Sequence, residues 1–133
     1  MKGYLLDTSV VLLALSAPES LSAQVRTAIE KGPTFLSVAV YWEVTIKAMK
    51  GSLDVGDPRL WFAQALDALG LRPLLLRPEH VAAVYSLPPL HQDPFDRILI
   101  AQAAAEEMTL LTTDSTIPKY ASDTVRVIHS SRR

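Results

Sequence analysis

Short apolar runs alternate along this chain with segments that have apolar residues at helical spacing, and the alternation predicts strands and helices in turn. The expected strands are residues 3–6, 34–37, 71–76, 109–113 and 125–128. Helix start and stop signals predict helices at residues 8–15, 21–31, 38–50, 58–69, 78–86 and 94–107. Strands that alternate with helices indicate an α/β fold with a mainly parallel sheet covered on both faces.

Aspartate–proline pairs mark two of the expected helix starts. Asp57 and Asp93 fit the N-cap position, and the proline that follows each of them fits the first helical turn. A third proline, Pro73, has no amide hydrogen to donate, so the strand at 71–76 is expected at the edge of the sheet.

The composition limits which kinds of protein the chain can be. With 133 residues and 49% hydrophobic residues, the chain is expected to form one domain, residues 1–133, around one core. The absence of cysteine excludes disulfides, a thiol nucleophile and cysteine-type zinc sites, and it fits a reducing cytosol. A net charge of −1 lacks the basic excess typical of non-specific nucleic-acid binders, although it leaves room for a local basic patch.

The N-terminus imitates a secretory signal, because Lys2 precedes apolar residues and the stretch ends in Leu15-Ser16-Ala17. The polar residues Asp7-Thr8-Ser9 interrupt that stretch, which makes the secretory interpretation the weaker one. No run approaches the ~20 apolar residues that span a bilayer. The sequence therefore predicts a soluble, cytoplasmic protein that does not enter a membrane.

Four carboxylates lie at the ends of apolar segments or inside them. Asp7 and Asp114 directly follow predicted strands, Glu43 lies inside an apolar segment, and Asp96 opens another. Acids without a nearby base are costly to hold beside a core unless a cation neutralises them. Ligands of parallel sheets collect outside the carboxyl ends of the strands, near a topological switch point. Acids that converge there would suit a hard divalent cation such as Mg²⁺.

Each acid also has a purely structural interpretation. Asp7 and Asp114 fit helix caps or turns, which aspartate often forms after a strand. Glu43 could form an exposed i,i+4 pair with Lys47, which would contribute ~0.2–0.5 kcal/mol. Asp96 in a first helical turn would gain ~0.3–1 kcal/mol from the helix dipole. On pattern alone, these alternatives stay open.

Other kinds of site lack support in the sequence. His80, His91 and His129 are isolated from further ligands, so we expect structural or exposed histidines and no zinc centre. No Gly-x-Ser-x-Gly elbow occurs, which argues against a serine triad. No glycine-rich phosphate loop occurs either, so ATP or NAD use is not predicted.

Taken together, the chain resembles the PIN-domain ribonucleases, and most closely the VapC toxins of bacterial and archaeal toxin–antitoxin pairs. The resemblance covers nearly the whole chain and rests on four motifs in order: Leu5-Leu6-Asp7-Thr8-Ser9, Trp42-Glu43, Asp93-Pro94-Phe95-Asp96-Arg97 with Leu99-Ile100-Ala101-Gln102-Ala103, and Leu111-Thr112-Thr113-Asp114. It implies a three-layer α/β/α sandwich and endonucleolytic cleavage of RNA that depends on Mg²⁺, for which Mn²⁺ can substitute. It also implies a homodimer and a small antitoxin partner whose C-terminal segment enters the active-site groove.

The resemblance assigns roles residue by residue. The implied catalytic quartet is Asp7, Glu43, Asp96 and Asp114. Asp7, Asp96 and Asp114 are the implied metal ligands, and Asp93 either joins them or only caps its helix. Implied contacts to the site or to RNA come from Thr8, Ser9, Lys47 and Arg97, and less firmly from Thr113. Arg97 could instead pair with an acid, and Glu43 could orient the attacking water or hold a second metal.

Two other classes of protein compete with this interpretation. A haloacid-dehalogenase-like phosphatase needs an acid two residues after the first aspartate, where this chain has Ser9. A receiver domain needs an acidic pair before its phosphorylated aspartate and a lysine after a late strand, and neither pattern fits. A non-catalytic interaction module whose acids only cap helices remains open. The sequence indicates neither the RNA cleaved nor the number of metal ions.

Overall fold

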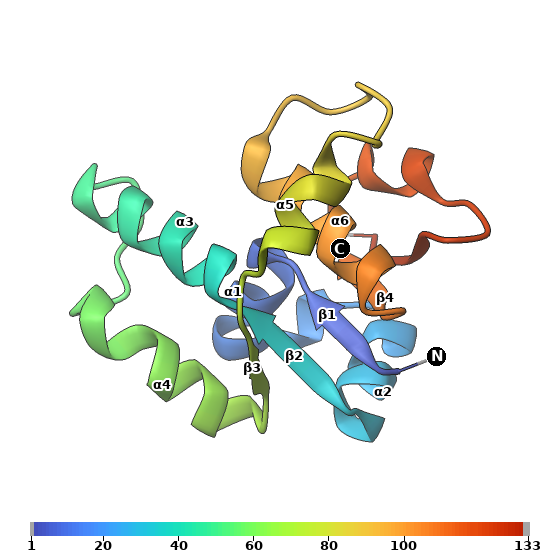
Figure 1. The fold of residues 1–133 in the computed structure, drawn as a ribbon. Helices are drawn as coiled ribbons and strands as arrows, with labels where there is room; N and C mark the ends of the chain where they lie inside the picture. The colour runs from blue at the N-terminus through green and yellow to red at the C-terminus, as the bar shows by residue number, and fades with distance from the viewer. Residues whose placement is uncertain (1, 132–133) are drawn as a thin grey trace.

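A computed structural model of the chain describes residues 2–131, which form a parallel five-stranded sheet between layers of helices (Figure 1). Residues 1, 132 and 133 of the predicted domain lie outside the described residues. The strands are β1 Tyr4–Leu6, β2 Thr34–Ser37, β3 Arg72–Leu74, β4 Thr109–Thr112 and β5 Arg126–His129. The helices are α1 Thr8–Ser16, α2 Ala23–Lys31, α3 Val38–Met49, α4 Pro58–Leu69, α5 Pro78–Val84 and α6 Pro94–Ala105, with 3-10 turns η1 Pro18–Ser20 and η2 Ile117–Tyr120.

The central strands carry the core, as expected for a sheet that is covered on both faces. Leu5 and Leu6 of β1, Leu36 of β2, and Leu110 and Leu111 of β4 are completely buried. Helices α5 and α6 pack together on one face, and α1 contacts α4 in the opposite layer (Figure 1). The predicted three-layer α/β/α sandwich is confirmed.

The sheet has the strand order β3-β2-β1-β4-β5, and all of its adjacent strands are parallel. From β1 the chain moves outward to β2 and β3, then crosses back so that β4 lies on the other side of β1. The boundary between β1 and β4 is therefore the topological switch point, where α/β sheets bind ligands. Leu6 pairs with Leu111 across this boundary, so Asp7 and the residues after Leu111 begin at the same edge.

The main differences from the predicted elements lie at β3 and in the turns. The predicted strand 71–76 is paired only over Arg72–Leu74, because β2 ends at Ser37 and offers no partner beyond it. Pro73 does lie on an edge strand, as expected. The two 3-10 turns were not predicted. Within residues 2–131, no helix is long and apolar enough to span a bilayer.

Candidate active site

A pocket of about 280 Å³ lies at the switch point and is lined mainly by acids. Its lining residues are Asp7, Thr8, Ser9, Leu12, Glu43, Lys47, Asp93, Asp96 and Asp114. All four members of the predicted quartet therefore come together, and they do so with Asp93, Thr8, Ser9 and Lys47. Arg97 and Thr113 are not among the lining residues.

Asp7 is both the cap of α1 and an acid of the pocket. Its Oδ1 accepts a hydrogen bond of 2.8 Å from the Val10 amide, and its Oδ2 accepts a short bond from the Thr112 hydroxyl. The side chain is almost completely buried, and burial raises the pKa of Asp7 to about 6 despite these two bonds. The charges of Asp114 and Glu43 contribute to this rise. Capping and membership of the pocket are therefore not alternatives at this position.

Thr112, which the sequence analysis did not single out, joins two of the acids. In addition to its bond with Asp7, its Oγ1 accepts a hydrogen bond of 2.9 Å from the Asp114 amide. The hydroxyl expected at the site from Thr113 is thus supplied by its neighbour. The pairing of Leu6 with Leu111 places Thr112 beside Asp7, a relation that only the strand register reveals.

Glu43 projects from α3 with both carboxylate oxygens bonded. The Thr8 hydroxyl donates to Oε1 at 2.5 Å, and the Lys47 ammonium lies 2.8 Å from Oε2. The Glu–Lys pair considered above does form, but only 5% of Glu43 is exposed. The hydrogen bond to Glu43 is the main cause that raises the pKa of Lys47. Lys47 is half-exposed and faces the pocket as its basic side chain.

The start of α6 brings two more acids into the pocket. Asp93 caps the helix through Oδ1, which accepts hydrogen bonds from the amides of Phe95 at 2.8 Å and Asp96 at 3.3 Å. Asp96, in the first turn, has its pKa raised to about 7 by burial and next by the charge of Asp93. Asp93 is thus a cap, as its place before Pro94 predicts, and also a negative charge at the site.

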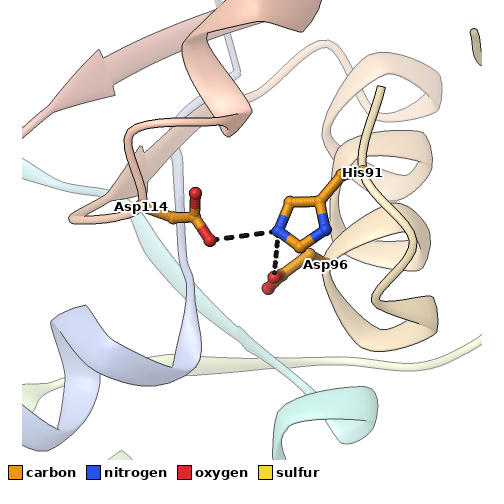
Figure 2. A group of neighbouring side chains, drawn as sticks. All are labelled: His91, Asp96 and Asp114. Carbon is orange, nitrogen blue, oxygen red and sulfur yellow. Dashed lines mark hydrogen bonds and ion pairs between the residues drawn. The ribbon is translucent and has the colours of Figure 1, made fainter. Parts of the chain in front are cut away.

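His91 lies among these acids, contrary to the expectation of an isolated histidine. Its Nε2 is 3.0 Å from Asp96 Oδ2 and 3.0 Å from Asp114 Oδ2 (Figure 2). Burial acts to lower the pKa of His91, but the hydrogen bond to Asp114 and the nearby acids raise it overall. Burial acts to raise the pKa of Asp114, but bonds from His91 and the Thr116 amide lower it overall. The loop before Asp93 held no sequence signal for this contact.

The donor set fits a hard divalent cation. Within residues 2–131, one group of three potential ligands, His91, Asp96 and Asp114, has ligand atoms that all lie within 4.8 Å of one another. Asp7 is outside that group but lines the same pocket, and its charge raises the pKa of Asp96. Carboxylate oxygens are the ligands that Mg²⁺ takes, usually one or two together with water. The pKa values of Asp7 and Asp96 are raised because both acids are buried and nearby basic groups do not fully compensate their negative charge.

The side chain of Arg97 makes different contacts from those expected. Its Nη1 donates to Pro88 O at 3.0 Å, His91 O at 3.3 Å and the Tyr120 hydroxyl at 3.1 Å. Its Nη2 donates to the carbonyl oxygens of Val84 and Leu87. In place of the predicted phosphate or acid contact, Arg97 holds the loop between α5 and α6 against η2.

The PIN domain family matches residues 4–123 of the chain. This protein belongs to the PIN domain family. A comparison with curated protein sequences gives no match.

Solved structures share the fold of this PIN domain at low sequence identity. One is VapBC2 from Rickettsia felis bound to a DNA fragment from its promoter, with a TM-score of 0.70, 16% identity, and coverage of 96% of this chain and 98% of that one. DNA-bound VapBC from Salmonella typhimurium has a TM-score of 0.68, 14% identity, and coverage of 97% and 98%. FitAcB from Neisseria gonorrhoeae has a TM-score of 0.64, 20% identity, and coverage of 95% and 96%. At these identities, the likeness shows the fold alone.

Proposed function

We propose that residues 1–133 form a single nuclease domain that cleaves RNA with the help of Mg²⁺, as the VapC-type toxin of a type II toxin–antitoxin pair. The observation that carries this proposal is the pocket at the switch point of a PIN fold, where Asp7, Glu43, Asp96 and Asp114 line one cavity. These acids come from four separate stretches of the chain. Helix capping accounts for Asp7 and Asp93, but it does not account for the burial of Glu43 or the position of Asp96.

Asp7, Asp96 and Asp114 are assigned as the metal ligands, directly or through water. A bound Mg²⁺ would supply an activated water and would stabilise the negative charge that develops on the phosphate oxygens. Glu43 is fixed by Thr8 and Lys47, so its carboxylate is placed to orient a water or accept its proton. The remaining Asp93 helps to set the negative charge of the pocket and starts α6.

The substrate contacts are assigned to side chains at the rim of the acids. Lys47 is half-exposed and lines the pocket, so it can contact an RNA phosphate while it stays close to Glu43. Ser9 lines the same cavity and offers a hydroxyl. Arg97 is left out of this set, because its guanidinium is occupied by the loop of residues 84–91.

We assign a protein antitoxin as the partner and the cytoplasm as the location. The neighbours from Rickettsia felis and Salmonella typhimurium are VapBC structures bound to DNA, and a further neighbour from Klebsiella pneumoniae is a toxin–antitoxin complex. These relations support a partner of the same kind for this chain.

A second copy of the chain is the proposed occupant of an apolar groove of about 450 Å³ between α3, α5 and α6. The groove is lined by Ala39, Trp42, Leu76, Val81, Val84, Tyr85, Pro94, Phe95 and Ile98. Trp42 is 59% exposed and Tyr85 is 95% exposed, although both rings are large. Homodimer interfaces are more apolar than those of separable partners, which favours a second copy over the antitoxin at this groove.

The decisive experiment is RNA cleavage by purified protein with Mg²⁺, compared with Asp7→Asn and Asp96→Asn. We expect both variants to lose at least a hundredfold in rate while circular dichroism shows a retained fold, because each substitution removes a charge that holds the metal. Asp57→Asn is the matched control, because Asp57 caps α4 as Asp7 caps α1 but does not line the pocket.

Cleavage that survives both substitutions and EDTA would place the activity elsewhere or in a contaminant. Folded wild-type protein that binds RNA or an antitoxin but never cleaves RNA would support the non-catalytic module instead.

A further inference from the structure

The imidazole of His91 occupies the gap between two of the assigned metal ligands (Figure 2). Its Nε2 lies 3.0 Å from Asp96 Oδ2 and 3.0 Å from Asp114 Oδ2, and these are the kind of oxygens that a divalent cation would take. Among residues 2–131, no other side chain forms an ion pair with either of these two acids. His91 is therefore the group with which a cation would have to share the site.

The other ring nitrogen fixes the direction of the hydrogen bond between Nε2 and Asp114. The Asp93 amide donates to His91 Nδ1 at 3.1 Å, so Nδ1 offers a lone pair and the ring proton is on Nε2. Nε2 consequently donates its proton to Asp114 Oδ2, and Asp96 Oδ2 lies at the same distance of 3.0 Å from this nitrogen. To ligate a metal through Nε2, the neutral ring would need its proton on Nδ1, where it would meet the Asp93 N–H donor to donor. In this arrangement His91 is built as a donor and not as a ligand.

The loop that carries His91 is fastened from two sides. The amides of Leu90 and His91 donate to the Tyr120 hydroxyl at 3.1 and 2.8 Å, and Arg97 donates to Pro88 O and His91 O. The backbone is thus held by η2 and α6, so displacement of the ring from the acids would require only rotation about the bonds of the His91 side chain. Arg97 therefore helps to position His91 at the site, although Arg97 itself does not line the pocket.

We propose that His91 is a placeholder for the cation: it holds Asp96 and Asp114 at ligand spacing and competes with the metal for their oxygens. This inference rests on the proposed function, because it assumes that these acids bind a divalent metal. His91 is a positioning residue that acts through Asp96 and Asp114. It stabilises the metal-free protein by separating like charges, and it weakens metal binding by the same interaction.

The test is the affinity of the full chain for Mn²⁺, measured by electron paramagnetic resonance of the free ion, at a mildly alkaline pH. We expect His91→Ala to bind Mn²⁺ about tenfold more tightly than the wild type, because a charge-assisted hydrogen bond no longer competes. His91→Gln retains an amide donor and should bind with an affinity between the two. His129→Ala is the matched control, because His129 is the last residue of β5 and contacts Thr113 O but none of the acids.

Thermal melting supplies a second readout that also checks folding. Without metal, His91→Ala should melt below the wild type, and saturating Mn²⁺ should raise its midpoint by more than it raises that of the wild type. Weaker or unchanged Mn²⁺ binding by folded His91→Ala would overturn the placeholder. If neither the wild type nor His91→Ala binds Mn²⁺, the proposed metal dependence fails and this inference fails with it. A third result is that Asp96→Asn abolishes Mn²⁺ binding and His91→Ala weakens it. This result would leave the proposed function intact and would reject only the placeholder role of His91.

Discussion

At the scale of single residues, one carboxylate serves a structural and a chemical purpose at once. Asp7 begins α1 by accepting the Val10 amide, and its burial beside Asp114 and Glu43 leaves it with a raised pKa. An N-cap aspartate exposed to water has no burial to raise its pKa, and the pKa of Asp57, which caps α4 beside Arg59, is lowered. The chain thus places a buried, incompletely compensated acid at a position where any small polar residue would satisfy the helix.

This placement predicts that Asp7 destabilises the metal-free protein at neutral pH. Folding raises its pKa from 3.8 to about 6, so the folded state binds the proton more tightly than the unfolded chain does. The contribution of Asp7 to stability is therefore lost as pH rises from about 4 through about 6, and a shift of this size corresponds to on the order of 2–3 kcal/mol. Asp7→Asn should melt several degrees above the wild type at alkaline pH in EDTA, and the difference should shrink in acid.

Differential scanning fluorimetry across this pH range checks the prediction. Asn can still accept the Val10 amide, so the capping bond does not confound the comparison. Asp57→Asn is the control for the loss of a capping charge, and because the pKa of Asp57 is lowered, its neutralisation should bring no gain in stability. A midpoint for Asp7→Asn below that of the wild type at alkaline pH would contradict the raised pKa.

The four acids could be found from the sequence because Asp7, Asp96 and Asp114 lie at the ends of apolar elements and Glu43 interrupts an apolar segment. His91 and Thr112 could not be found in this way. The contact of His91 with Asp114 depends on a loop whose course is set by Arg97 and Tyr120, and none of these contacts is local in sequence. Arg97 itself was expected to contact an RNA phosphate or to pair with an acid, because a basic residue beside an acid gives no sign that backbone carbonyls will surround it.

At the scale of elements, periodicity and capping located all five strands and all six helices of the described residues, while pairing decided their lengths. The strand predicted at 71–76 is shorter in the structure, where it forms β3, because its partner β2 ends at Ser37 and α3 begins directly after it. The order of the strands was not predicted beyond the edge position of Pro73. Long-range pairing of β1 with β4 is what brings Asp7 and Asp114 to one edge, and no local pattern encodes it.

At the scale of the whole molecule, the apolar groove beside the active site predicts a dimer. Light scattering of the wild type should give about twice the chain mass of 14.6 kDa, because a groove this apolar is costly to leave in water. Tyr85→Glu, which puts a charge on the most exposed ring of the groove, should give the mass of one chain. A monomeric wild type, or a Tyr85→Glu variant that stays dimeric, would rule out this groove as the dimer interface.

The fold gathers acids from distant stretches of the chain at one switch point, and the proposed nuclease activity depends on a divalent ion among them. The most direct measurement is an anomalous difference map from crystals grown with Mn²⁺. We expect a peak about 2.0–2.2 Å from carboxylate oxygens of Asp96 or Asp114, with Asp7 in contact directly or through a water, and with the ring of His91 displaced from both acids. Crystals at saturating Mn²⁺ with no peak in this pocket, or with a peak bound only elsewhere, would contradict it.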